Sequence, residues 1–433
     1  MMNASKILLD TLHAEVKPAM GCTEPVAVAL AVAKAKELCI ADTNADYMKF
    51  MVDVKVSPNI FKNGLSVGIP GTDQVGLLMA IALGITACES VYGLEVFKSV
   101  NATAIESAFQ LIKNGQIKIG ITDTDSKVYV EATVVNGTTY GKAIIENRHD
   151  QFVHLEQNGE VQLSASDHHD APIIVNPLYD MKISEIIEAV EKLPYSEIEF
   201  LLEGYEMNTQ VATFGLTMPA GMNVGKTLQH NVEKGLLTDD LMNRAMILTA
   251  AASDARMSGA SLPVMSSNGS GNNGLTAILP LVAYAQKVDC SQDALARAAA
   301  ISHLVNSMIK HNIGRLSALC GCGVAAGTGA SVAITWLMGG TPVQLDGAIQ
   351  NMIANTTGMI CDGAKVGCSL KLATSASAAV QSALLALGDV IVPNGNGVIG
   401  KTADDTIKNL GVLSKNAMDT VDRVILEIMM DQV

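Results

Sequence analysis

Apolar residues at the N-terminus follow helical spacing with one interruption. They recur every three or four positions through residues 5–39, and the interruption falls at Pro18 and Gly21. This pattern predicts a helix, a tight turn through PAMGCTEP, and a second helix through VAVALAVAKAKEL. Thr23 is a suitable N-cap for the second helix. Cys22 is therefore expected at the positive end of a helix.

From about residue 45 the pattern changes to alternation of apolar and polar residues. MKFMVDVKVSPN alternates in this way, and further alternating segments follow a helical stretch near 76–114. In one of them, every second residue from Val128 to Val134 is apolar and would point to the same face. The Asn-Gly pair that follows is a strong hairpin signal. This part of the chain is predicted to form a small unit with an antiparallel sheet.

The remainder of the chain, from MKISEIIEAVEKL onward, has the pattern of helices joined by glycine-rich turns. A polar, proline-interrupted connector, ASDHHDAPIIVNPLYD, precedes it, and its adjacent histidines are more typical of a surface than of a metal site. We therefore predict an α+β fold in three parts. Residues 1–44 form N-terminal helices that carry the GCTEP turn and pack on the catalytic domain, residues 45–175 form a smaller mixed α/β domain with an antiparallel sheet, and residues 176–433 form the predominantly helical catalytic domain.

Length, composition and charge limit the class of partner. The chain has 433 residues, more than one hydrophobic core usually organises, and 49% of them are hydrophobic but only 4% aromatic. Such a core must be built largely from small aliphatic residues and methionine, which favours closely packed helices. The formal charge of −14 disfavours binding to nucleic acid or to an anionic membrane surface. We expect a small-molecule partner, and the small-residue helices would suit a homodimer.

The hydropathy of the chain raises the question of membrane segments. The best candidate, GVAAGTGASVAITWLMGG at residues 323–340, is rich in Gly, Ser and Thr and barely reaches spanning length, which favours a buried helix. The N-terminus lacks the basic start and apolar stretch of a signal peptide. We expect a cytoplasmic protein with no membrane segment.

Eight cysteines in a cytoplasmic protein point to metal binding or catalysis rather than to disulfides. Half of them lie in two glycine-rich segments, at Cys320, Cys322, Cys361 and Cys368. These thiols could hold a structural zinc ion or an iron–sulfur cluster, or they could be buried core thiols. A four-iron cluster held by three thiolates would keep one iron open as a Lewis acid. The remaining cysteines outside the GCTEP turn, Cys39, Cys88 and Cys290, lie in apolar segments and are interpreted as core residues.

Two polar loops could bind a small ligand. VSPNIFKNGLSVGIPGT and MSSNGSGNNGLTAILP offer free backbone amides and asparagine side chains, which suit an amino-acid headgroup, although such stretches also occur as simple turns. Neither has the spacing of a Walker or Rossmann loop, so nucleotide binding has no support. Lys310 and His311 precede Cys320 closely enough to reach a site there, but could equally be a solvated lysine and a structural histidine.

Five motifs occur in a fixed order along the chain: PAMGCTEP, VSPNIFKNGLSVGIPGT, SSNGSGNNG, GRLSALCGCGVAAGTGA and GMICDGAKVGC. Together they resemble the L-cysteine desulfidase family, which is related to the catalytic alpha region of iron–sulfur L-serine dehydratases. The resemblance covers nearly the whole chain. It implies a [4Fe–4S] cluster held by Cys320, Cys361 and Cys368, with Cys322 as an extra thiol nearby, and a catalytic role for Cys22.

The reaction that the resemblance implies is β-elimination, in which L-cysteine loses sulfide and the product hydrolyses to pyruvate and ammonia. A thiol at a helix N-terminus has a lowered pKa, so Cys22 is expected to act as the base or as the acid that returns a proton. The small amino-acid substrate would be bound by residues of the motifs and of the segment before Cys320. The candidates are Thr23, Glu24, Asn59, Asn63, Asn268, Gly269, Asn272, Asn273, Lys310 and His311.

Two other functions fit the same sequence. An L-serine dehydratase would keep the fold and the cluster and differ only in the leaving group. A non-catalytic protein would use the clustered thiols for a structural zinc ion and the polar loops for binding a ligand. Iron and labile sulfide content would separate this last protein from the two enzymes.

Overall fold

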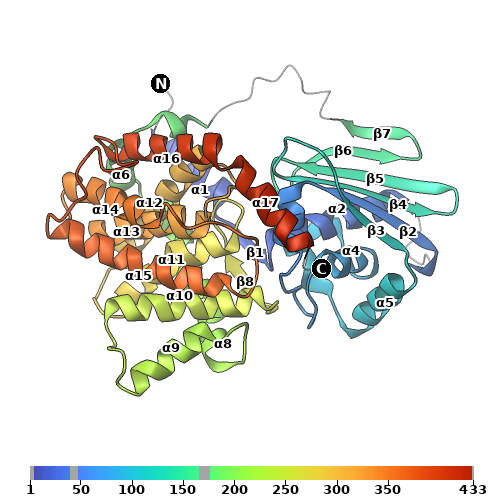
Figure 1. The fold of residues 1–433 in the computed structure, drawn as a ribbon, viewed down its shortest axis with the longest axis horizontal. Helices are drawn as coiled ribbons and strands as arrows, with labels where there is room; N and C mark the ends of the chain where they lie inside the picture. Colours follow the sequence, from blue (N-terminus) through green and yellow to red (C-terminus); the bar gives the residue numbers. More distant parts are fainter. Residues whose placement is uncertain (1–3, 40–46, 165–175, 432–433) are drawn as a thin grey trace.

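The structure, a computed structural model, describes residues 4–39, 47–164 and 176–431. The fold is α+β, as predicted, with a helical domain and a smaller domain built on a six-stranded sheet. The two domains lie side by side along the long axis of the molecule (Figure 1). The DHHD histidines of the connector fall outside the described residues.

The sheet of the small domain has the strand order β3-β2-β4-β5-β6-β7. Neighbouring strands are antiparallel except for the parallel pair β2 and β3, so the predicted antiparallel sheet is a mixed one. The predicted alternation is confirmed, because β2 buries every second side chain and Val130, Ala132 and Val134 of β4 are fully buried. The strands are β2 (Phe50–Val56), β3 (Ile117–Ile121), β4 (Tyr129–Asn136), β5 (Thr139–Glu146), β6 (Phe152–Gln157) and β7 (Glu160–Ser164).

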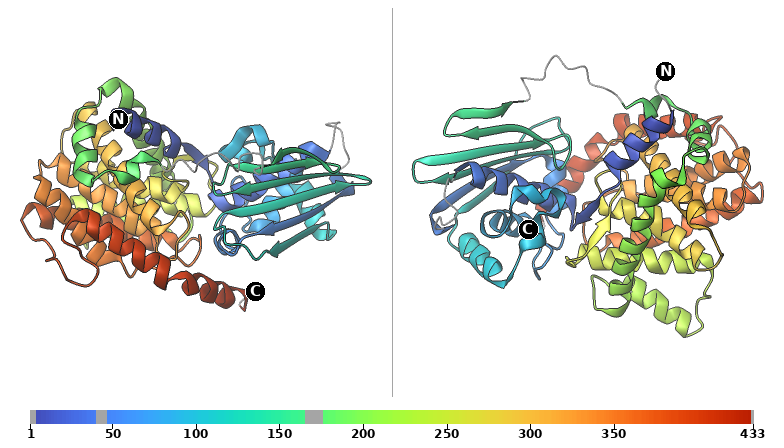
Figure 2. Two further views of the ribbon diagram at one scale, coloured as in Figure 1. Left: turned by 90° about the horizontal axis from the view of Figure 1, so that it is seen from above. Right: turned by 180° about the vertical axis from the view of Figure 1, so that it is seen from behind.

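Helices cover one face of this sheet (Figure 2). They are α2 (Thr23–Cys39), α3 (Pro58–Gly64), α4 (Leu77–Thr86) and α5 (Ala102–Lys113), with the 3-10 segments η1 (Tyr47–Lys49) and η2 (Ser90–Ser99). The Ala- and Val-rich α2 is buried nearly all round and contacts both the sheet and α4. Gly141 of β5 permits this approach, because a Cβ atom there would lie 2.1 Å from the carbonyl oxygen of Ala35. The prediction that all of residues 1–44 pack on the helical domain is therefore wrong for α2, which belongs to the core of the small domain.

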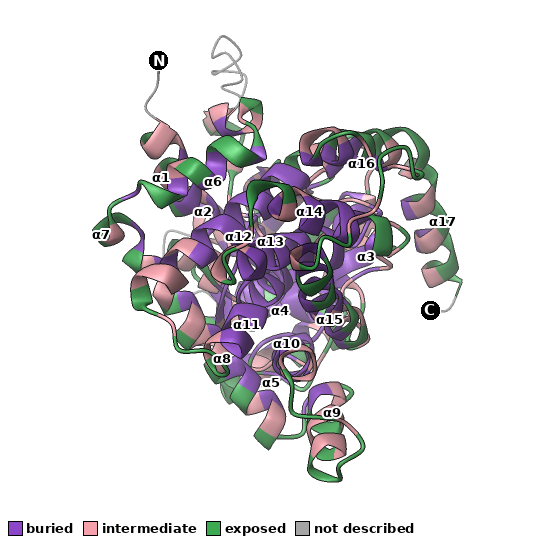
Figure 3. Cartoon of the chain, turned by 90° about the vertical axis from the view of Figure 1, so that its left-hand side faces the viewer, coloured by how far each residue is buried: buried purple, intermediate pink, exposed green. Residues whose placement is uncertain are grey.

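The helical domain is built around α11, α12 and α13, which are largely buried (Figure 3). The first helix of the chain, α1, packs on this domain beside α6 and α12. Residues 327–335 are fully inside the domain, which confirms the buried helix predicted within 323–340. The helices are α1 (Ala4–Glu15), α6 (Ile183–Glu191), α7 (Tyr195–Ile198), α8 (Leu202–Thr217), α9 (Val224–Glu233), α10 (Leu241–Met257), α11 (Gly271–Ala285), α12 (Gln292–Ile313), α13 (Gly327–Leu337), α14 (Pro342–Thr356), α15 (Cys368–Leu387), α16 (Ala403–Ala417) and α17 (Asp419–Met430), with short segments η4 (Pro177–Asp180), η5 (Glu199–Leu201) and the π-turn η6 (Cys322–Ala326).

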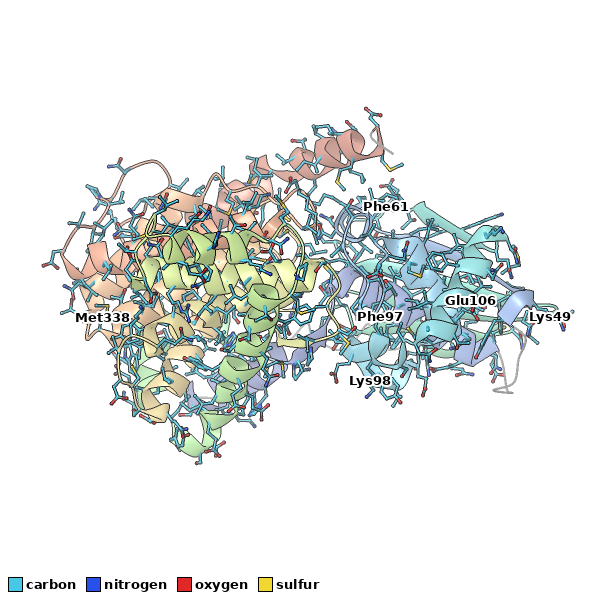
Figure 4. All side chains as sticks on the ribbon, turned by 90° about the horizontal axis from the view of Figure 1, so that it is seen from below. Lys49, Phe61, Phe97, Lys98, Glu106 and Met338 are labelled. Carbon is cyan, nitrogen blue, oxygen red and sulfur yellow. The ribbon has the colours of Figure 1, made fainter. Side chains whose placement is uncertain are left out.

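Within the described ranges, β1 (Pro18–Met20) and α17 link the two domains. The short strand β1 follows α1 of the helical domain, pairs with β8 (Pro263–Met265), and leads into α2 of the small domain. The C-terminal helix α17 leaves the helical domain and contacts α3 of the small domain. Figure 4 labels Phe61 of α3 close to this junction, whereas Met338 and Lys49 mark the outer ends of the two domains.

One helix of the described chain, α15, is long and apolar enough to cross a membrane by length and composition. The pair formed by α4 and η2 passes the same test only if a bend of 108° is ignored. In α15, 56% of the apolar stretch is buried inside the protein. Leu372, Ala376 and Val380 of this helix contribute to the protein core, which accounts for its apolar character.

Candidate functional site

A cavity of about 90 Å³ lies where the two domains meet, and both domains contribute to its wall. Helices α2, α11 and α15 begin at this wall, so the positive ends of their dipoles lie at the cavity. Of the residues that the sequence singled out, Thr23 and His311 lie outside the wall. Those in it are Cys22, Glu24, Asn59, Asn63, Asn268, Gly269, Asn272, Asn273, Lys310, Cys320, Cys322, Cys361 and Cys368.

The pairing of β1 with β8 brings two distant loops together. Pro18 lies opposite Met265 in this small sheet, and beyond it the Asn268 amide donates to the carbonyl of Glu15 at 3.0 Å. Gly21 adopts a left-handed φ of 76°, which lets the chain turn sharply into α2. As a result, the GCTEP turn and the SSNGSGNNG loop line the same cavity.

Cys22 and Glu24 form a buried pair at the start of α2. The thiol donates to Oε2 of Glu24 at 2.9 Å, and the same oxygen accepts from the Thr23 hydroxyl at 3.2 Å. The other carboxylate oxygen, Oε1, accepts from Nδ2 of Asn63 at 3.0 Å. Because α2 begins at Thr23, the residue predicted as its N-cap is instead its first residue and Cys22 precedes it.

The predicted lowering of the Cys22 pKa is wrong. Burial raises the pKa of this thiol well above its ordinary value, and the Glu24 carboxylate raises it further, while Arg256 opposes both. Burial also acts to raise the pKa of Glu24, but His149 and hydrogen bonds from Cys22 and Asn63 outweigh it, so the pKa is lowered. Burial and the neighbouring carboxylate therefore decide the state of Cys22, and at neutral pH the pair is a thiol beside a carboxylate.

Arg256 fixes the two loops to each other, and the sequence reasoning missed it. Its guanidinium donates to the carbonyl of Gly21 at 2.7 Å and to Oδ1 of Asn272 at 3.0 Å. The side chain is only 3% exposed. The available signal was an arginine two residues after Asp254, in the C-terminal half of α10 that is otherwise built of small or apolar residues, because a buried charge needs dedicated partners.

Side chains of α12 contact the SSNGSGNNG loop at Ser267. The Ser267 hydroxyl accepts from Nδ2 of Asn306 at 2.9 Å and lies 2.9 Å from Nδ1 of His303. Asn268, which follows, has a left-handed φ of 52°. Asparagine tolerates this conformation better than most residues, which accounts for the Asn-Gly pair at the tip of the loop.

Several buried polar atoms in the cavity wall lack hydrogen-bond partners. Within the described ranges, these include Oδ1 of Asn63, Oδ1 of Asn273 and Nε2 of His149. Buried polar groups are nearly always satisfied in folded proteins, so unpartnered atoms around a cavity indicate a polar ligand or ordered water. The two amide oxygens are acceptors and, with the Glu24 carboxylate, they suit an ammonium group.

The two glycine-rich segments bring cysteines to the same cavity. The Cys320 amide donates to the carbonyl of Met359 at 2.8 Å, and the Cys361 amide donates to the carbonyl of Ala318 at 2.7 Å. The two cysteines therefore lie on neighbouring extended segments. Cys368 is the first residue of α15 and lines the same cavity.

These thiols are protonated in the metal-free chain. A hydrogen bond with Cys322, together with burial, raises the pKa of Cys320, and burial raises the pKa of Cys361 and brings that of Cys368 to about 11. Metal binding would have to displace these protons. In the described part of the chain, no group of three or more His, Cys, Asp or Glu side chains is arranged to hold a single metal ion.

Lys310 and His311 have different surroundings although they are adjacent in α12. Lys310 is 6% exposed, lines the cavity and donates to the carbonyl of Arg315. Burial lowers its pKa to about 8. His311 instead stacks on Tyr179 with ring centroids 3.8 Å apart, because consecutive helix residues point about 100° apart. The structure therefore does not bring His311 to the site.

Asn59 and Lys62 of α3 hold the C-terminal helix at the edge of the cavity. Nδ2 of Asn59 donates to Oδ2 of Asp422 at 2.9 Å, and Lys62 forms an ion pair with the same carboxylate. The Lys62 ammonium also donates to the carbonyl of Cys361 at 3.2 Å. The hydrogen-bonding capacity of Asn59 is thus used on α17, and Lys62, which the sequence reasoning missed, links that helix to a cysteine segment.

Asp422→Ala is expected to destabilise the protein by about 3–5 kcal/mol, because it leaves the Lys62 ammonium, 2% exposed, buried without its counter-charge. Urea denaturation followed by circular dichroism measures the loss. Arg423→Ala on the same helix is the control, since Arg423 is 72% exposed and pairs with Glu427 at the surface. Equal urea midpoints for Asp422→Ala and the wild type would contradict this reading of the Lys62 pair.

Comparison with known proteins places the site in a family context. The family model described as serine dehydratase alpha chain matches residues 91–427. UPF0597 proteins from Alkaliphilus metalliredigens and Alkaliphilus oremlandii are 55% and 54% identical to this chain; the alignments cover 98% and 99% of it, and 95% and 99% of the relatives. A UPF0597 protein from Clostridioides difficile is 49% identical over 98% of this chain and 99% of the relative.

Proposed function

Because this chain belongs to the serine dehydratase alpha-chain family together with the UPF0597 proteins, we propose that its interdomain cavity catalyses β-elimination of a small L-amino acid. We infer L-cysteine as the substrate, with sulfide, pyruvate and ammonia as the products after hydrolysis. The observation that carries the proposal is that the buried Cys22–Glu24 pair and the four cysteines of the two glycine-rich segments line one cavity.

Members of the family generally depend on an iron–sulfur cluster, and the residues present here fit one. Cys320, Cys361 and Cys368 would hold it, since thiolates are the usual ligands of such clusters and all three line one cavity at which α15 begins. Because no group in the described ranges is arranged to hold a single metal ion, the proposal rests on the thiol chemistry of these three residues and on the cavity that they share. When bound through three cysteines, a [4Fe–4S] cluster supplies an open iron that can act as a Lewis acid toward the leaving group.

Other side chains and backbone amides of the cavity wall suit the amino-acid headgroup. The unpartnered oxygens of Asn63 and Asn273, with the Glu24 carboxylate, would accept hydrogen bonds from the substrate ammonium. The amides at the start of α11 and the cation of Lys310 would favour the substrate carboxylate. Burial of these groups strengthens each contact because water is excluded.

Cys22 would act in this site as a proton donor. Its thiol is held in place by the hydrogen bond to Glu24, and burial keeps the proton on sulfur at neutral pH. After the carbon–sulfur bond breaks, the enamine product needs a proton at its former β carbon to become the imine that hydrolyses to pyruvate. A positioned thiol can supply this proton and be re-protonated afterwards from solvent.

An L-serine dehydratase is the second candidate, because the matching family model is described by that activity. The experiment compares kcat/KM for pyruvate formation from L-cysteine and from L-serine, with protein purified without oxygen. We expect L-cysteine to be preferred by about tenfold or more, within the range that pocket contacts can discriminate. A preference for L-serine would make L-serine the assigned substrate in place of L-cysteine. If iron-loaded protein forms no pyruvate from either amino acid, β-elimination is contradicted.

The free thiols agree with a reducing compartment. All eight cysteines lie in the described ranges and none of them forms a disulfide. Thiols remain reduced in the cytoplasm, and an exposed iron is best protected from oxidation there. We therefore place the enzyme in the cytoplasm.

A further inference from the structure

His149 enters the cavity from the small domain, and neither the motifs nor the proposed chemistry has so far used it. It lies in the turn between β5 and β6, where Asn147 has a left-handed φ of 67° and the Arg148 amide donates to the carbonyl of Glu146 at 2.8 Å. This tight turn places His149 in the wall of the interdomain cavity, where it is only 6% exposed.

The imidazole of His149 is buried, but its Nε2 makes no hydrogen bond to a described residue. Its Nε2 lies 4.0 Å from Oε1 of Glu24 and has no hydrogen-bond partner in the part of the chain that the structure describes. On the other side, a Cβ atom at Gly269 would lie 3.5 Å from Nδ1, so the SSNGSGNNG loop passes close to the ring. A histidine in this position has a free nitrogen between the two segments that are expected to bind the substrate.

The other candidate bases at the cavity are already occupied. The Cys22 thiol donates its proton to Glu24, and both oxygens of Glu24 accept hydrogen bonds, from Cys22, Thr23 and Asn63. Lys310 donates to a backbone carbonyl. The elimination needs a group that takes a proton from carbon. His149 offers an unused nitrogen that is basic, whereas the unpartnered Nε of Arg256 belongs to a guanidinium that cannot accept a proton.

We propose that His149 is the catalytic base that removes the Cα proton of the substrate, an inference that rests on the proposed function. Nε2 accepts the proton, the electrons of the Cα–H bond form the Cα–Cβ double bond, and the Cβ–S bond breaks with its electron pair leaving on sulfur. The resulting imidazolium is stabilised by the Glu24 carboxylate nearby. No oxidant or reductant is needed.

The surroundings of His149 also provide a path for the proton. His149 lines a second cavity of about 20 Å³, together with Arg148, Asp150 and Arg315, and this volume has room for a water molecule. The side chains of Arg148 and Asp150 are about one third exposed, at 33% and 31%. The imidazolium can therefore exchange its protons with solvent through this second cavity.

The pH dependence has a defined sign. The charged groups that face His149 are Glu24 on α2, Asp150 beside it, Arg315 in the loop after α12 and Lys310 on α12. Burial is the largest influence and lowers the pKa of His149 below its ordinary value of 6.5. The base is then neutral and active at pH 7, and kcat/KM falls as the pH drops through a value below 6.5.

The experiment compares wild type, His149→Gln and His149→Asn with His154→Gln, a control on β6 whose imidazole pairs with Glu156 outside the cavity. Removing the base should lower kcat by about 10²–10⁴-fold. The inhibition constant of L-alanine, which has the headgroup but no leaving group, should stay within about threefold, because the base contributes to the transition state rather than to ground-state binding. The kinetic isotope effect with α-deuterated L-cysteine should rise in the variants. The fall of kcat/KM at acidic pH, which we call the acidic limb of the pH profile, should disappear in them.

The outcomes separate this inference from the proposed function. If the wild type forms pyruvate and His149→Gln retains more than about a tenth of its rate with an unchanged acidic limb, His149 is not the base and the function stands. If neither histidine variant folds, the dependence of wild-type kcat/KM on pH still tests the assignment of His149. The absence of an acidic limb below pH 6.5 would overturn that assignment. If the iron-loaded wild type forms no pyruvate, both fail.

Discussion

Cys320→Ala, Cys361→Ala and Cys368→Ala are each expected to lose both the iron–sulfur cluster and pyruvate formation. Each variant removes one of the three proposed cluster ligands, all of which line a single cavity, and a cluster held by only two would be labile. Iron and acid-labile sulfide analysis, with the visible absorption of protein purified without oxygen, measures the cluster. Activity should fall to background in all three variants, since the open iron is lost with the cluster.

Two further cysteines provide matched controls for these variants. Cys322→Ala removes a thiol only two residues from Cys320, and it is expected to keep the cluster because our account does not use Cys322 as a ligand. Cys290→Ala lies outside the cavity and should match the wild type in iron content and rate. Full iron content in any of the three ligand variants would contradict the assignment of that cysteine.

Cys22→Ala is expected to lower turnover by about 10²–10⁴-fold while iron content stays at the wild-type level. The thiol is the proton donor in our account and takes no part in holding the cluster. Steady-state pyruvate formation gives the rate, and the visible spectrum reports the cluster in the same sample. Cys39→Ala, at the other end of α2, is the control for removing a buried thiol from this helix.

The Cys22 prediction depends on the hydrogen bond that holds the thiol. Cys22→Ser keeps a donor to Glu24 but replaces the thiol with a much weaker acid, so it should be nearly as inactive as Cys22→Ala. A serine variant with wild-type turnover would show that the group acts only through its hydrogen bond. An alanine variant with wild-type turnover would exclude any chemical role for Cys22.

Much of the fold could be predicted because its signals are local. The alternation in β2 and β4 and the Gly, Ser and Thr content of α13 depend on neighbouring residues, and the structure agrees with both. The domain to which α2 belongs could not be predicted in this way. An Ala- and Val-rich helix that is apolar all round has no polar face to show its direction, so its packing partner is decided by residues far away in the sequence.

The site shows the same division between local and distant signals. Loops rich in Gly, Asn and Cys were visible in the sequence, and the structure brings most of their selected residues to one cavity. Arg256 and His149 belong to no motif, and each faces a partner more than a hundred residues away in the sequence. The raised pKa of Cys22 was missed for a related reason. A helix N-terminus can be read from the sequence, whereas the burial that outweighs it cannot.

The central claim is that an amino acid binds beside a cluster held by Cys320, Cys361 and Cys368. Electron paramagnetic resonance of the protein, purified without oxygen and reduced, tests it most directly in samples with and without L-cysteine. Our account predicts the signal of a reduced [4Fe–4S] cluster, and a change in that signal when L-cysteine is added. A protein that yields no cluster signal after supply of iron and sulfide, or a signal that L-cysteine leaves unchanged, would contradict the account.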